Sequence, residues 1–246
     1  MKKIVIAGRN DSGKSTILGE IYRGLKAKDF QPLAIGSGVQ DEKPYLLKGI
    51  DVNYLAIAMP KPGEDVITDV ERVIKQAVNQ IKEKNRLIQH ARKALEELNK
   101  VRSVLDLGCL TQRDIPPTSS VPDVSLVEAV GINDGYKSVE TKAIADMLVT
   151  IVPANIKTEI LVEPGNILLD DADIIVVTKI DATPRSASSA VIKLLQRIYR
   201  HKPIIPVVAT DGVHVDLVIE EVMKRIAEPM VLLDMQKPRE IAPKTS

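Results

Sequence analysis

The chain has 246 residues, with 34 basic and 33 acidic side chains and a formal net charge of +1 at pH 7. This balance argues against nucleic acid as the main partner, because nucleic-acid binding usually requires a strongly basic surface. No apolar run approaches the roughly 18–20 residues needed to cross a bilayer, and a single cysteine, Cys109, excludes an internal disulfide or a thiolate metal cage. The sequence therefore predicts a soluble, cytoplasmic globular protein that binds neither nucleic acid nor membrane.

Short apolar runs alternate with amphipathic stretches, which is the pattern of a parallel sheet covered by helices on both faces. The expected strands are 3–7, 32–36, 53–59, 123–130, 147–152, 173–178 and 204–208. The expected helices are 14–28, 66–100, 137–146, 184–199 and 216–228. We predict an α/β fold of three layers with a mostly parallel central sheet of about seven strands. It forms one domain over residues 1–233, followed by a flexible tail at 234–246.

The segment from residue 66 to 105 is unusually long for one helix, and residues 64–120 form a long helical insertion in the domain. Apolar residues recur there at spacings of three or four: Ile74, Ala77, Ile81, Ile88, Ala91, Leu95 and Leu98. One continuous helix would extend about 50 Å. It either turns back near residues 84–86 as a hairpin, lies on the sheet, or projects as an arm whose apolar stripe needs a partner or a second copy. Its basic residues are interleaved with glutamates, which favours a solvated face over a nucleic-acid patch.

Residues 8–16, GRNDSGKST, match the P-loop pattern G-x-x-x-x-G-K-[ST] between an expected strand and an expected helix. Two glycines let successive backbone N–H groups point at phosphate oxygens, and the helix N-terminus adds its positive end. Lys14 is expected to reach the β- and γ-phosphates, and the Ser15 hydroxyl to bind Mg²⁺. A carboxylate at Asp11 would repel phosphate, so it should point to solvent, a metal or a partner chain. The expected nucleotide contacts of the loop are Asn10, Asp11, Ser12, Gly13, Lys14, Ser15 and Thr16.

A second motif follows a buried strand near residue 178, where the chain reads Thr178, Lys179, Ile180 and Asp181. The Asp181 carboxylate can accept both the N1–H and N2–H₂ donors of guanine, a pair that adenine does not offer. The stem of Lys179 can lie along the base. The simpler alternative is that Asp181 only caps the end of the strand.

With these motifs in this order, the sequence resembles the SIMIBI class of P-loop GTPases. It is most similar to the metallochaperone branch, which includes the GTPases that assist methylmalonyl-CoA mutase and the nickel-insertion proteins of urease and hydrogenase. The segments that resemble this branch are 127–131 (VEAVG), 171–179 (DADIIVVTK) and, upstream, 40–43 (QDEK). The chain departs from the branch at residues 35–38, where relatives carry an aspartate, and at Thr178, which replaces an asparagine and should lose one contact around the base. It also lacks a histidine-rich metal-carrying segment.

The resemblance implies roles for further residues. Glu128 and Asp41 would hold Mg²⁺ together with Ser15, and the Gly131 backbone N–H would contact the γ-phosphate. Residues 131–136 would then form a switch loop that distinguishes GTP from GDP. Backbone groups at Ala209 and Thr210 would contact the guanine. The expected catalytic residues are Lys14, Glu128 and Gly131.

The sequence therefore favours a Mg²⁺-dependent GTPase, a switch that assists metal or cofactor loading, or assembly, of a client enzyme. The client would be a metalloenzyme or a cofactor-dependent enzyme, and the chain could act as a homodimer. Two alternatives stay open. One is a P-loop ATP-dependent small-molecule kinase or ATPase, for which an arginine-rich lid is missing. The other is an interaction module in which the nucleotide only stabilises the fold and the long helix binds the partner.

Overall fold

The computed structural model describes residues 1–37, 55–57, 66–104, 118–129, 145–163 and 165–227. Within them lie seven strands: β1 Lys2–Gly8, β2 Pro32–Ser37, β3 Leu55–Ile57, β4 Val124–Glu128, β5 Met147–Pro153, β6 Ile174–Thr178 and β7 Ile204–Pro206. The described helices are α1 Lys14–Lys26, α2 Val66–Val104, α4 Thr158–Val162, α5 Ile167–Asp170, α6 Arg185–Ile198 and α7 Val215–Ala227.

The strands form one sheet in the order β3-β2-β4-β1-β5-β6-β7, and every neighbouring pair is parallel. The chain leaves β1 toward one side of the sheet, returns through β4 and continues to the other side through β5. This places β1 where the strand order reverses. In open parallel sheets, ligands bind beyond the carboxyl ends of the strands at such a point.

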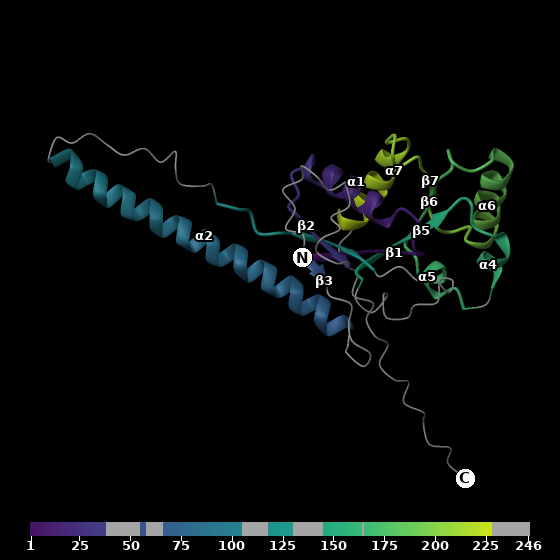
Figure 1. Ribbon diagram of the computed structural model, residues 1–246, viewed down its shortest axis with the longest axis horizontal. Coiled ribbons are helices and arrows are strands. Elements are labelled where there is room, and N and C mark those ends of the chain that lie inside the picture. The colour runs from purple at the N-terminus through teal and green to yellow at the C-terminus, as the bar shows by residue number, and fades with distance from the viewer. Residues whose placement is uncertain (38–54, 58–65, 105–117, 130–144, 164, 228–246) are drawn as a thin grey trace, which may run out of the picture.

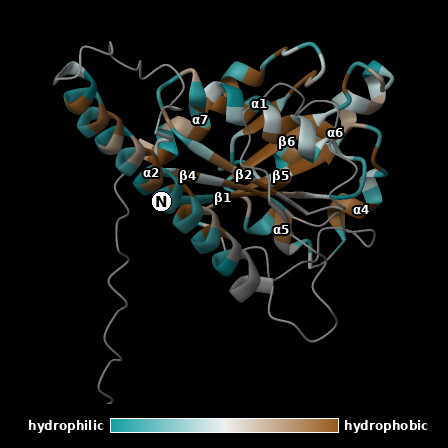
Figure 2. Ribbon diagram, turned by 60° about the vertical axis from the view of Figure 1, so that its left-hand side comes forward, coloured by the Kyte–Doolittle hydropathy of each residue, from teal (hydrophilic) through white to brown (hydrophobic). Residues whose placement is uncertain are grey.

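Helices cover both faces of the sheet, which explains the continuous apolar runs in the strands (Figure 1). Ile4 and Ile6 of β1 face a core cluster with α1 and α7, whereas Val5 and Ala7 face a second cluster with residues of α2, α4, α5 and α6. Figure 2 shows the apolar strands enclosed between the helical layers. The predicted three-layer α/β fold with a parallel sheet is confirmed.

The predicted elements and the observed ones differ mainly in short segments. Two short helices, α4 and α5, were not predicted, because four or five residues are too few to show a helical period. The predicted helix 137–146 lies almost entirely, and the tail 234–246 wholly, outside the described residues. Within the described residues, no helix combines the length and apolar character that a bilayer crossing requires.

Helix α2 is one continuous helix of 39 residues, so the predicted turn-back near residues 84–86 is wrong. At 1.5 Å per residue it is about 58 Å long. Ile74 and Ala77, near its start, pack in the core beside β2 and β4. Ile81 and Ile88 are buried as well, and the helix projects from the domain toward its far end (Figure 1). Farther along, the Asn85 side chain exchanges two hydrogen bonds with the backbone of Ser119, so the returning chain lies against the middle of the helix.

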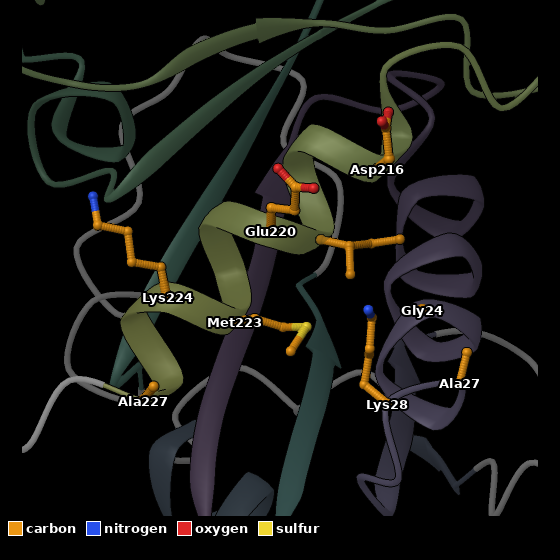
Figure 3. A pocket seen from close by; sticks show the side chains of 9 residues that line it. Gly24, Ala27, Lys28, Asp216, Glu220, Met223, Lys224 and Ala227 are labelled. Carbon is orange, nitrogen blue, oxygen red and sulfur yellow. The ribbon is translucent and has the colours of Figure 1, made fainter.

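Helices α1 and α7 pack side by side on one face of the sheet, next to an open groove of about 590 Å³. Their contact is close because Gly24 of α1 has no side chain. A Cβ atom built there would lie 2.3 Å from Cδ1 of Ile219. Figure 3 shows the groove between the two helices, with Met223 directed toward α1 and the charged groups of Asp216, Glu220 and Lys224 around it.

Replacing Gly24 with alanine should therefore destabilise the fold. The new methyl group meets three carbon atoms of Ile219 at 2.3–2.9 Å, and such overpacking typically costs about 1–3 kcal/mol. We expect urea denaturation to report that loss in the free energy of unfolding. In an Ile219→Ala background the same Gly24→Ala change should be neutral or stabilising, because alanine favours a helix over glycine by about 1 kcal/mol. An equal loss in both backgrounds would contradict the close contact.

Candidate functional site

The P-loop forms the turn between the carboxyl end of β1 and the start of α1. Gly8 lies against β5: a Cβ atom there would be 2.6 Å from the Ile151 carbonyl oxygen and 2.9 Å from Ser12 Oγ. Gly13 and Asp11 both adopt positive φ angles, of 92° and 54°, which curl the loop toward the helix. The pattern's glycines are thus required by a tight backbone approach and a left-handed turn. The Asp11 side chain is exposed, as its charge led us to expect.

Lys14 is the first residue of α1, and its ammonium group lies within the loop. Its side chain is only 7% exposed, and Nζ donates a hydrogen bond of 2.8 Å to the Arg9 carbonyl oxygen. Burial lowers the pKa of Lys14, while the negative charges of Glu128 and Asp11 act in the opposite direction. A buried cation held by one neutral carbonyl is poised to exchange that partner for an anion.

Ser15, which follows Lys14 in α1, contacts Glu128. Ser15 Oγ donates a hydrogen bond of 2.8 Å to Glu128 Oε1. Glu128 ends β4, which pairs directly with β1, and this pairing brings two residues distant in sequence together. Burial raises the pKa of Glu128, and the bond from Ser15 and the charge of Lys14 counteract it. The structure therefore brings together two of the three predicted metal ligands.

The start of α1 presents unused hydrogen-bonding groups. No side chain of the described residues caps this helix, and its first turn contains no acidic residue. The Ser12 hydroxyl is fully buried and has no hydrogen-bond partner among the described residues. Uncapped N–H groups and the positive end of a helix form a binding site for an anion. The cradle predicted from the sequence pattern has the polar groups that an anionic ligand needs.

The strand-end motif lies directly beside the P-loop. Thr178 Oγ1, buried at the end of β6, donates a hydrogen bond of 2.6 Å to the Ser12 carbonyl oxygen. Its hydroxyl therefore joins the two motifs, and the loss of a contact around the base stays a prediction. Lys179 then turns with a φ of 57°, and Thr183 Oγ1 closes the turn on the Lys179 carbonyl at 2.7 Å. Asp181 is exposed within this turn.

The second segment predicted to contact the base follows β7 at the same edge of the sheet. Val208 and Val213 pair across a tight turn that contains Ala209 and Thr210. Ala209 packs against the core on the side of α1, and Thr210 is exposed. The Val207 backbone N–H bonds to Val177 of β6 at 2.8 Å, which fixes this turn beside the Thr178–Asp181 segment.

Comparison with solved structures decides the fold class. The hydrogenase maturation factor HypB from Archaeoglobus fulgidus matches with a TM-score of 0.57 and 15% identity, over 91% of this chain and 89% of that chain. HypB from Helicobacter pylori, in complex with nickel, matches with a TM-score of 0.57 and 15% identity over 92% and 86%. The chain has the fold of these two HypB structures, as the resemblance to the SIMIBI class implies.

A third SIMIBI-class structure, a LAO/AO transport system kinase, matches with a TM-score of 0.51 and 13% identity over 92% of this chain and 59% of that chain. No protein-family model and no curated protein matches the sequence. At these identities the likeness concerns the fold. In the part of the chain that the structure describes, no three His, Cys, Asp or Glu side chains come together as a metal-binding group.

The SIMIBI-class fold thus brings together most of the predicted site, from Asn10–Thr16 to Glu128 and Thr178–Asp181. Asp41, Gly131 and the proposed switch loop 131–136 lie outside the described residues. Sequence reasoning missed two groups, the Arg9 carbonyl that holds Lys14 and the Thr183 hydroxyl that closes the base turn. A backbone carbonyl leaves no signal in a sequence. A threonine four residues after Lys179 was a usable sign of a closed turn.

Proposed function

We propose that this protein is a Mg²⁺-dependent GTPase that works as a switch for a client enzyme. The observation that carries the proposal is the hydrogen bond from Thr178 Oγ1 to the Ser12 carbonyl. It joins a phosphate-binding loop to a motif whose carboxylate, Asp181, matches the hydrogen-bond donors of guanine. A triphosphate on the loop and a guanine at the strand end would then occupy one continuous site.

The oxygen donors beside the loop fit Mg²⁺, a hard cation that prefers carboxylate, hydroxyl and water ligands. Ser15 and Glu128 would hold it, and we propose Asp41 as a further ligand. The 2.8 Å bond between Ser15 and Glu128 keeps both oxygens in one place, and a cation would compensate the buried carboxylate. When bound, Mg²⁺ neutralises charge on the β- and γ-phosphates.

Residues of the chain itself bind the phosphates and the base. Lys14 leaves the Arg9 carbonyl and binds β- and γ-phosphate oxygens, and the uncapped N–H groups of α1 bind the remaining charge. Water attacks the γ-phosphorus, the bond from that phosphorus to the bridging oxygen breaks, and GDP, phosphate and a proton are released. We propose that the Gly131 N–H senses the γ-phosphate and that Ala209 and Thr210 line the base site. Asp181 and the stem of Lys179 hold the guanine throughout.

The client role rests on the overall likeness to a hydrogenase maturation factor over about nine tenths of both chains. We propose that GTP binding and hydrolysis alternate two conformations, and that these assist metal or cofactor loading, or assembly, of a partner enzyme. The partner would be recognised in one nucleotide state and released in the other.

Phosphate release from purified protein tests the proposed chemistry. We expect release from GTP at a rate well above that from ATP, without any added acceptor, because Asp181 accepts two donors that only guanine presents. Removing Mg²⁺ with a chelator should abolish release, and adding Mg²⁺ back should restore it. Faster release from ATP, or phosphate transfer only when a small-molecule acceptor is added, would favour the kinase alternative.

Thr178→Val tests the hydrogen bond from Thr178 to the Ser12 carbonyl, which connects the strand-end motif to the P-loop. Valine keeps the shape but leaves the Ser12 carbonyl without its donor, so we expect a stability loss of about 1–3 kcal/mol and GTP binding weakened by roughly tenfold. Thr150→Val is a matched control, since Thr150 is also buried and donates to a carbonyl, that of Leu168 in α5, which does not belong to the P-loop. It should lower stability similarly and leave GTP affinity unchanged. If both variants weakened GTP binding equally, the hydrogen bond between Thr178 and Ser12 would have no specific role in binding GTP.

A further inference from the structure

The far half of α2 carries exposed apolar side chains. Leu87, Leu98 and Val101 are 57%, 47% and 56% exposed, although the helix begins in the core of the domain. Hydrophobic residues scattered singly on a surface are ordinary, but these three share a helix that projects from the domain (Figure 1). The pattern of the helix decides whether they form one face.

The apolar residues of α2 follow a seven-residue repeat. One set is Ile74, Ile81, Ile88 and Leu95, a second, in which Lys84 occupies one position, is Ala77, Ala91 and Leu98, and a third is Leu87, Ala94 and Val101. Residues with this period form a stripe along one side of a helix and pack against a second helix in a coiled coil. Ile74, Ile81 and Ile88 are only 6–7% exposed. Leu87 lies beside Ile88, and Leu98 and Val101 continue the stripe toward the tip.

Charge identifies the occupant of this face. Between residues 82 and 102 there are seven basic side chains, Lys82, Lys84, Arg86, Arg92, Lys93, Lys100 and Arg102, against three acidic ones, Glu83, Glu96 and Glu97. The segment therefore carries a net charge of +4, whereas the whole chain carries only +1. Figure 2 shows α2 as largely hydrophilic, with apolar patches along it. A second copy of the helix would bring like charges together, which disfavours pairing.

We propose that the far half of α2, residues 82–102, is a docking arm for an acidic amphipathic helix of a partner protein. The apolar stripe contacts the apolar stripe of the partner helix, and Lys84 and Arg102, which lie one turn from Leu87 and Leu98, face its carboxylates. A nucleic acid would leave the exposed leucines unused and would meet the glutamates that interrupt the basic residues. This inference is independent of the proposed nucleotide chemistry, because no residue of the P-loop site takes part.

Two synthetic peptides test the arm with the full-length protein. Both contain about four heptads with leucine at the two core positions, and the flanking positions are glutamate in one and lysine in the other. By fluorescence anisotropy we expect the glutamate peptide to bind, with an affinity that falls as NaCl is raised, and the lysine peptide to bind at least about tenfold more weakly. Equal binding of the two peptides, or no binding of the glutamate peptide, would overturn the proposal.

Leu98→Ser combined with Val101→Ser should weaken binding of the glutamate peptide by about tenfold or more, because both contacts are lost from the stripe. Leu217→Ser is the matched control, since Leu217 is 44% exposed on α7, away from the arm. Circular dichroism should show unchanged helix content in all variants. Two results would overturn the acidic-helix assignment: sedimentation equilibrium showing a dimer that the double variant abolishes, or a DNA duplex binding the arm as tightly as the glutamate peptide.

Discussion

Replacing Lys14 with alanine is expected to abolish GTP turnover and to weaken GTP binding by about 10²–10³-fold. Lys14 is only 7% exposed, and within the described part of the chain its ammonium group donates to one neutral carbonyl, that of Arg9, at 2.8 Å. A phosphate is a far stronger partner for a desolvated cation, so most of the interaction energy appears only when the nucleotide binds. Isothermal titration calorimetry with GTP and a phosphate-release assay measure the two effects.

The same substitution should change stability little, because the fold does not depend on this cation. Removing the desolvated charge of Lys14 offsets the loss of its bond to Arg9. Lys28→Ala is the matched control: Lys28 is exposed just beyond the far end of α1, and its loss should leave affinity and turnover as they are. GTP affinity of Lys14→Ala within about threefold of the parent protein would contradict the phosphate site.

Asp181→Asn is expected to exchange guanine for xanthine as the preferred base. Guanine presents two donors, N1–H and N2–H₂, and the carboxylate accepts both, whereas an asparagine amide accepts one and opposes the other with its own N–H₂. We expect GTP affinity to fall about 10²-fold or more. Xanthine has a carbonyl in place of the 2-amino group, so xanthosine triphosphate should bind the variant better than GTP.

The control for this exchange is Asp29→Asn, which changes an exposed carboxylate at the end of α1 that is remote from the site. Its left-handed backbone, with a φ of 65°, suits asparagine, so folding should be unaffected. Competition binding with GTP, ATP and xanthosine triphosphate compares the variants. Unchanged GTP preference in Asp181→Asn would mean that Asp181 only ends the strand, the simpler alternative from the sequence.

The main layers of the fold were predictable because the strands are buried on both faces. Such strands appear in the sequence as apolar runs, and within the described residues all seven were placed to about two residues at each end. Helices α4 and α5 were missed, because a single turn carries no period. The course of α2 was left open between a hairpin, a sheet-packed helix and an arm. A repeat in sequence specifies an apolar stripe, but what covers it depends on tertiary packing.

The sequence predicted which residues form the candidate site, but not most of the hydrogen bonds between them. The pattern at residues 8–16 predicts a turn whose glycines the backbone requires. The resemblance placed Glu128 and Ser15 at one metal site, and the hydrogen bond between them was not predicted. The hydrogen bond from Lys14 to the Arg9 carbonyl was not predictable, because every residue has a backbone carbonyl. Thr178 was read as a weaker substitute for asparagine. Its hydroxyl reaches Ser12 because β6 and the P-loop meet at one edge of the sheet, a contact between residues distant in sequence.

We expect one continuous site to bind the triphosphate at the P-loop and the guanine at Asp181. A crystal structure with Mg²⁺ and a non-hydrolysable GTP analogue tests this directly. The phosphates should lie on the loop beside Lys14, and the Asp181 carboxylate should lie within about 3 Å of guanine N1 and N2. A base lying elsewhere, with Asp181 still facing solvent, would contradict it.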